Sequence, residues 1–161
     1  MVVGGEFLRL SGVKDGSVLS IQERLYPDST CFGCGQANPQ GLRLKSYQTD
    51  MVWHATFMPL EIHSNGMGSL NGGIIATILD CHSGAAVLAN AASDSGELTD
   101  LWVTAGLELR YRLPTFLDSP CELQAQIIEA SDSSLRVAAT LKSDGKVRVH
   151  AESRWARLPR R

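Results

Sequence analysis

The chain has 161 residues, of which 43% are hydrophobic and 20% charged, an ordinary balance for one globular domain with its own core. Fifteen basic and seventeen acidic residues give a formal net charge of −2, which argues against a nucleic-acid-binding protein with a basic face. The N-terminus does not resemble a signal peptide, and Asp80 and His82 interrupt the longest apolar stretch, so we expect a cytoplasmic protein that makes no membrane contact.

The first part of the chain has little periodic pattern. We treat residues 1–30 as an N-terminal extension of uncertain structure and residues 31–161 as the folded domain. The domain opens with a stretch rich in Gly, Asn and Pro, which is typical of a loop. Apolar Leu42 and Leu44 then alternate with charged residues, which predicts a strand, and a second strand is expected over residues 51–59. The two strands would pair through a turn near residue 50.

A long helix is expected from about Gly72 to Ala92, with Asn71 as its N-cap. The segment is apolar nearly all round, which indicates a buried helix. One face differs because, at about 100° per residue, it gathers mainly small or polar side chains. This small-residue face consists of Gly73, Ala76, Thr77, Asp80, Ser83, Gly84 and Val87. It would let a second helix, another backbone or a thin ligand approach the Asp80 carboxylate.

The remainder of the chain is predicted to form strands. Four strands are expected, over residues 101–114, 121–131, 134–145 and 146–158. The Asp-Gly pair before Lys146 is a hairpin signal, and the four strands would form a meander. Two strands, one buried helix and four further strands indicate an α+β protein in which an antiparallel sheet wraps around one long central helix.

The start of the predicted helix suggests acyl-transfer chemistry. A helix N-terminus exposes free amide groups, and Gly72 and Gly73 leave them unobstructed, as an oxyanion hole requires. Asp80 is then a candidate nucleophile or general base, because a buried carboxylate is costly unless it is paired or used. Eight residues of helix separate Gly72 from Asp80 by roughly 12 Å. The two groups can therefore act on one carbonyl only if they come from two copies of the helix.

The stretch "HSNGMGSLNGGIIATILDCH", followed by "LELRYRLP", resembles the hotdog-fold acyl-CoA thioesterases of the PaaI-like type. That family has an Asn, then a His-Gly-Gly whose first Gly lies seven residues after it, then an Asp eight residues later. Asn65, Gly72 and Asp80 have these spacings. The opening "CFGCGQANPQGLRL" is similar to one branch of the family, and the resemblance extends to about Arg157.

The resemblance implies a set of roles. The Gly72 amide would bind the thioester oxygen, and Asp80 of the partner subunit would attack the thioester or activate water. Asn65 would help to place the acid or the water, and Thr104, seven residues before a Tyr, would hold the attacking water. Asn71 stands where the family usually has His. Asn71 and the second glycine of the pair, Gly73, are candidates for substrate binding.

Each of these residues also has a purely structural interpretation. Asp80 would then be a carboxylate satisfied by a buried partner, and the glycines would permit close helix packing. Asn71 would serve only as a cap, Asn65 only as a turn residue before glycine, and Thr104 only as a strand residue.

The cysteines do not predict a metal site. Cys31 and Cys34 form C-x-x-C, but a structural zinc usually needs a second pair, and Cys81 and Cys121 are isolated in the sequence. His63 is the only further candidate ligand nearby. The motif is therefore interpreted as a structural loop, with no metal or other cofactor, and His82 as a packed helix residue.

The resemblance, together with the helix geometry, implies an acyl-CoA thioesterase that acts as a dimer or tetramer of hotdog subunits on an acyl-CoA or related acyl thioester. Three alternatives remain. The first is a non-catalytic acyl-CoA-binding hotdog protein, and the second is a hydratase or dehydratase, whose usual Asp-x-Asn-x-x-His signature is missing. The third is a scaffold dimer that binds no thioester.

Overall fold

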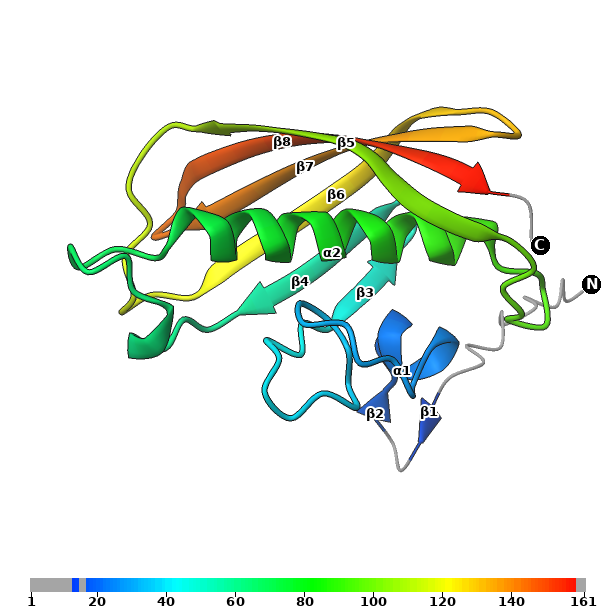
Figure 1. Ribbon diagram of the computed structural model, residues 1–161, viewed down its shortest axis with the longest axis horizontal. Coiled ribbons are helices and arrows are strands. Elements are labelled where there is room, and N and C mark those ends of the chain that lie inside the picture. Colours follow the sequence, from blue (N-terminus) through cyan, green and yellow to red (C-terminus); the bar gives the residue numbers. More distant parts are fainter. Residues whose placement is uncertain (1–12, 15–16, 159–161) are drawn as a thin grey trace, which may run out of the picture.

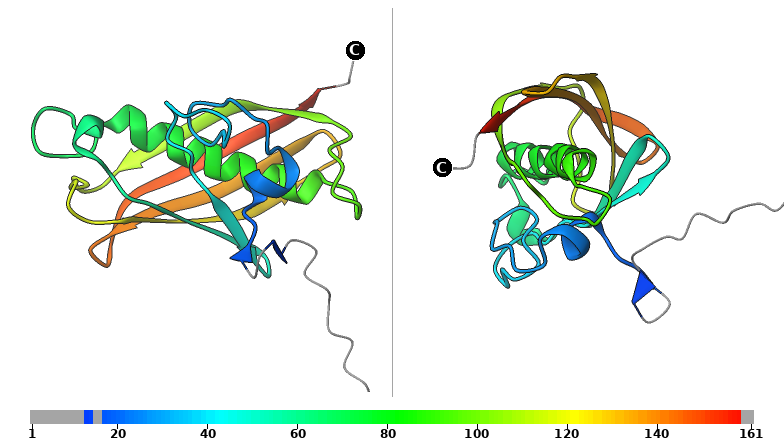
Figure 2. Two further views of the ribbon diagram at one scale, coloured as in Figure 1. Left: turned by 90° about the horizontal axis from the view of Figure 1, so that it is seen from below. Right: turned by 90° about the vertical axis from the view of Figure 1, so that its right-hand side faces the viewer.

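The computed structural model describes residues 13–14 and 17–158, and its centre is one long helix, α2, held against a curved antiparallel sheet (Figure 1). Seen along the helix, the sheet curls around it (Figure 2). The elements are β1 (Val13–Lys14), β2 (Ser17–Val18), α1 (Ile21–Leu25), β3 (Ser46–Thr49), β4 (Val52–Phe57), η1 (Glu61–His63), α2 (Gly72–Ala91), β5 (Leu101–Tyr111), β6 (Cys121–Ala130), β7 (Ser134–Ser143) and β8 (Lys146–Leu158). The predicted α+β class and hotdog architecture are confirmed.

Helix α2 begins and ends where the sequence signals it. Asn71 is the N-cap, in an extended conformation, and its Oδ1 accepts a hydrogen bond of 2.7 Å from the Gly73 amide. The helix ends at Ala91, and the Ala92 amide still donates to the carbonyl of Leu88. The predicted range of about Gly72 to Ala92 is thus confirmed, and the first glycine is the first helical residue.

The main sheet has the strand order β3-β4-β6-β7-β8-β5, with every neighbouring pair antiparallel. Asp144 and Gly145 both have positive φ and form the β7–β8 hairpin that the Asp-Gly pair predicts. Strands β6, β7 and β8 form a meander, but β5 pairs with β8 and not with β6, which follows it in the chain. The expectation of one continuous meander of four strands was wrong in this respect, and β5 is an edge strand.

The predicted strand at Leu42 and Leu44 was also wrong. The strand begins later, at Ser46, and it pairs with β4 around Asp50, which has positive φ. The alternation has another cause, because the amides of Leu42 and Leu44 donate to the carbonyls of Phe32 and Gly33 in the preceding loop. This ties the loop to the domain before the sheet starts.

The core lies between α2 and the concave face of the sheet. Ile75, Ile78 and Leu79 of the helix are buried together with alternate residues of β6 and β7. The small-residue face is split by this packing. Its C-terminal part is covered by the protein's own sheet, since a Cβ at Gly84 would lie 2.8 Å from the Trp155 ring. Its N-terminal part, from Gly73 to Asp80, is not buried.

His82 is a packed helix residue, as expected. Its Nε2 lies 3.2 Å from the Trp53 carbonyl, so this nitrogen donates and Nδ1 accepts from the Ser46 hydroxyl at 2.9 Å. Gln22 of α1 completes the network by two hydrogen bonds with Ser46. Burial lowers the pKa of His82 to about 4, so the ring is neutral at pH 7.

Helix α2 has the length and apolar composition of a membrane span, with a mean hydropathy of 1.4 in its most apolar window. Half of that window is buried inside the protein, and the core helix of a soluble domain has the same character. Asp80 and His82 therefore do not by themselves distinguish a membrane-spanning helix from a core helix.

Candidate active site

Gly72 presents a free amide at the mouth of a groove. Among the residues that the structure describes, none accepts a hydrogen bond from the Gly72 N–H, whereas the Gly73 N–H is already bound by Asn71. Tyr111 of β5 holds this turn, since its hydroxyl donates to the Gly72 carbonyl at 2.8 Å. The first glycine of the pair is thus the available oxyanion donor, and the second is occupied by the cap.

The groove has a volume of about 500 Å³ and lies between the loop before α2 and the end of β5. Its lining includes Asn65, Met67, Gly72, Tyr111 and Leu113. The structure therefore brings two of the predicted residues, Asn65 and Gly72, to one cavity. Asp80 and Thr104 do not line it.

Asn65 shapes the loop that borders this groove. Its Oδ1 accepts hydrogen bonds from the amides of Met67 at 2.8 Å and Ser69 at 3.2 Å. The backbone N–H of Asn65 donates to the Ser69 carbonyl at 2.8 Å. The side-chain oxygen is therefore used as a turn residue would use it, and only the Nδ2 group remains for a ligand.

Asp80 comes eight helical residues after Gly72, roughly 12 Å along the axis, and lies beside β5. Its Oδ1 accepts a hydrogen bond of 2.9 Å from the Thr104 hydroxyl, and no described residue donates to Oδ2. Half-burial raises the pKa of Asp80, and the bond from Thr104 partly opposes this shift. Asp80 and Thr104 thus contact each other within a single chain, whereas the predicted role of Thr104 in holding the attacking water stays a prediction.

A bulge in β5 accompanies this contact. The pairing with β8 shifts register between Thr104 and Gly106, which leaves Ala105 without a partner on β8. Bulges re-aim nearby side chains, and this one follows directly after the residue that meets Asp80. The sequence gives no clear sign of it beyond the glycine at 106.

Strand β5 connects the two halves of the candidate site. Thr104 contacts Asp80 and Tyr111 contacts Gly72, so the strand runs along the helix between these points (Figure 1). Eight helical residues still separate the acid from the donor, or about 12 Å along the axis. Tyr111 was not among the predicted site residues, because the sequence analysis used it only to locate Thr104, seven residues earlier.

Residues 67–150 match the family model described as thioesterase superfamily, and this span is just over half of the chain. It contains α2 and β5, including the contacts of Thr104 with Asp80 and of Tyr111 with Gly72. The chain belongs to the thioesterase superfamily. The matched span thus includes five of the six predicted site residues, all except Asn65: Asn71, Gly72, Gly73, Asp80 and Thr104.

Solved structures have the same hotdog fold. A thioesterase superfamily protein aligns with a TM-score of 0.65 at 24% identity, over 79% of this chain and 60% of that chain, so this chain spans less than two thirds of that protein. The PaaI protein of E. coli, from its phenylacetic acid degradation operon, has a TM-score of 0.63 at 13% identity, covering 73% of this chain and 81% of that chain. A hypothetical thioesterase of Streptococcus pneumoniae TIGR4, solved with coenzyme A, has a TM-score of 0.61 at 18% identity, covering 73% and 88%. No curated protein matches the chain.

Proposed function

We propose that this protein is an acyl-CoA thioesterase, which hydrolyses a thioester to a carboxylic acid and free coenzyme A. The observation that carries the proposal is the Gly72 amide, which donates to no described residue, at the start of a central helix that also carries the half-buried Asp80. The superfamily of the chain supports the reaction class. The coenzyme A in the Streptococcus pneumoniae structure supports a CoA ester as the substrate.

In the proposed reaction the thioester oxygen accepts a hydrogen bond from the Gly72 amide, which stabilises the negative charge that develops on it. Asp80 either attacks the carbonyl carbon or removes a proton from a water molecule that attacks it, and both roles need the ionised carboxylate. The carbon–sulfur bond then breaks. If Asp80 has attacked directly, water next hydrolyses the anhydride between the acyl group and Asp80, which releases the carboxylic acid and restores the carboxylate. A thiolate leaves without strong acid help, because the pKa of a thiol is about 8.5.

The acid and the donor come from two subunits in this proposal. Edge strand β5 leaves a row of backbone groups without a partner strand in the described chain, and such an edge invites a second copy. If two β5 strands paired antiparallel about a two-fold axis between Thr104 and Tyr111, Thr104 of each subunit would lie opposite Tyr111 of the other. The Asp80 of one subunit would then lie opposite the Gly72 of the other. Ala76, midway between them on the unburied part of the small-residue face, leaves room for the two helices to approach.

A panel of CoA esters of different chain length, assayed for free thiol release, tests the reaction. Wild type should hydrolyse at least one ester, and Asp80→Asn should lower its turnover by roughly a hundredfold to ten-thousandfold. The matched control is Asp132→Asn, an exposed carboxylate in the β6–β7 turn. An Asp80→Asn variant within a fewfold of wild type would remove Asp80 from the mechanism. Tight binding of CoA esters without hydrolysis would favour the non-catalytic acyl-CoA-binding alternative.

A further inference from the structure

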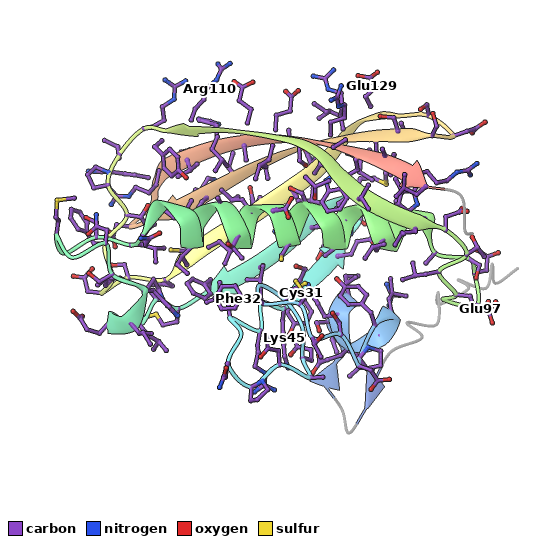
Figure 3. The ribbon with its side chains drawn as sticks, viewed as in Figure 1. Cys31, Phe32, Lys45, Glu97, Arg110 and Glu129 are labelled. Carbon is purple, nitrogen blue, oxygen red and sulfur yellow. The ribbon has the colours of Figure 1, made fainter. Side chains whose placement is uncertain are left out.

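Three cysteines from two distant segments meet beside α2. The Cys31 and Cys81 sulfurs are 3.7 Å apart although the residues are 50 positions apart in the chain. The sulfurs of Cys31, Cys34 and Cys81 all lie within 4.8 Å of one another. Figure 3 shows Cys31 directly beside the helix. The expectation that Cys81 is isolated was therefore wrong, because the fold supplies the third sulfur that the C-x-x-C motif lacks.

The loop that carries Cys31 and Cys34 is built to fit against Cys81. A Cβ at Gly33 would lie 2.3 Å from the Cys81 sulfur, so only glycine lets the loop backbone come this close. A Cβ at Gly35 would lie 2.5 Å from the Cys31 amide nitrogen. The Gly35 amide donates to the Cys31 carbonyl at 2.8 Å and closes a tight turn over the motif.

The three thiols differ in exposure in a way that suits a bound ion. Cys34 is buried, Cys81 is partly buried and Cys31 is exposed. Two sulfurs can therefore hold an ion from the protein side, while the third lies on the solvent side and leaves an entry path. All three are free cysteines.

We propose that Cys31, Cys34 and Cys81 bind one zinc ion, with water as the fourth ligand on the exposed side. Zinc prefers tetrahedral thiolate ligands at about 2.3 Å, which places neighbouring sulfurs about 3.8 Å apart. The 3.7 Å between the Cys31 and Cys81 sulfurs already matches this sulfur–sulfur distance. The Cys34 sulfur lies within 4.8 Å of both, so small side-chain rotations would bring it to the same distance. Soft thiolates select zinc over magnesium or calcium, which prefer oxygen ligands.

The ion would join the N-terminal loop to α2 at the residue next to Asp80. Its role is to fix the loop against the part of the helix that carries the candidate acid. Binding releases the thiol protons as the three sulfurs become thiolates, and it involves no change of oxidation state. This proposal does not depend on thioester hydrolysis, because it concerns a metal site that can be assayed without any substrate.

The test is elemental analysis of the full chain, purified with a reducing agent and without chelators. We expect about one zinc per chain in wild type, and a large loss of bound zinc in Cys34→Ser and Cys81→Ser. The matched control is Cys121→Ala, which removes a buried cysteine that is not part of the cluster and should keep the metal. Iron in place of zinc, or equal zinc in all four proteins, would overturn the proposal.

A second measurement on wild type alone covers the case in which the serine variants do not fold. The metal-stripped, reduced protein is titrated with Co²⁺, which should give the visible bands of tetrahedral cobalt and the near-ultraviolet bands of thiolate ligation, saturating at about one ion per chain. Zinc should then displace the cobalt. Absence of these bands, or an intact mass that shows a disulfide among the three cysteines in the purified protein, would overturn the zinc site.

Discussion

Gly72→Pro removes the proposed oxyanion donor with little other change. Proline lacks the N–H, and it is well tolerated at the first position of a helix, which Gly72 occupies. Asn71 has φ −60° and ψ 132°, an extended conformation that suits a residue before proline. A Cβ at Gly72 would lie 3.5 Å from the Tyr111 hydroxyl, an ordinary contact. The variant should therefore fold with nearly wild-type stability.

The expected loss is large because the donor acts on charge that develops only in the transition state. Removal of one oxyanion-hole donor lowers kcat by about a hundredfold to a thousandfold, or about 2.7–4 kcal/mol. The KM should change much less. The matched control is Gly72→Ala, which adds the same Cβ but keeps the amide and should retain most of the activity.

Steady-state thiol release from the best CoA ester, together with thermal unfolding of each variant, measures these effects. A Gly72→Pro kcat within threefold of wild type would refute the assignment of the Gly72 amide. An equal loss in Gly72→Ala and Gly72→Pro would also refute it, because the effect would then come from the added carbon and not from the lost donor.

Two further changes probe the acid and the N-terminal helix. Thr104→Val removes the hydrogen bond to Asp80 and should lower kcat/KM about tenfold. Thr104→Ser keeps the hydroxyl, so its kcat/KM should stay near that of wild type. Equal kcat/KM values for the two variants would exclude a positioning role for Thr104. The hydrogen bond from Lys45 lowers the pKa of Glu23 from 4.5 to about 2, so this carboxylate contributes stability above pH 4.5 that is lost as the pH falls toward 2. The ion pair is partly exposed, since 43% of the Lys45 side chain and 29% of the Glu23 side chain are accessible to solvent. We therefore expect it to contribute about 1 kcal/mol to the free energy of unfolding. Denaturant unfolding of wild type and Glu23→Gln should differ by this amount at pH 6 and converge near pH 2; a constant difference would contradict the linkage.

Local signals in the sequence were sufficient for the helix and for most of the sheet. Asn71 before a glycine pair predicted the helix start, and the Asp-Gly pair predicted the β7–β8 turn, because each acts within a few residues. The spacing of Gly72 and Asp80 likewise follows from helix geometry alone.

Contacts between distant segments could not be predicted in this way. Cys81 joins Cys31 and Cys34 only because the loop packs on α2, and no local pattern encodes that approach. The pairing of β5 with β8, and hence the contact of Tyr111 with Gly72, depends on how the whole sheet curls. The alternation at Leu42 and Leu44 was misleading because it reflects burial of a loop that is held by backbone hydrogen bonds.

Mixing of two inactive variants tests the central claim, that the acid and the donor of each site come from different subunits. One chain carries Gly72→Pro and the other Asp80→Ala, and each homodimer should be nearly inactive. When equal amounts are refolded together, random pairing makes about half of the dimers mixed, and each mixed dimer has one site with both groups intact. Thiol release should recover to about a quarter of the wild-type rate. If both groups served a site within one chain, every site would keep a defect, and a mixture as inactive as its components would contradict the account.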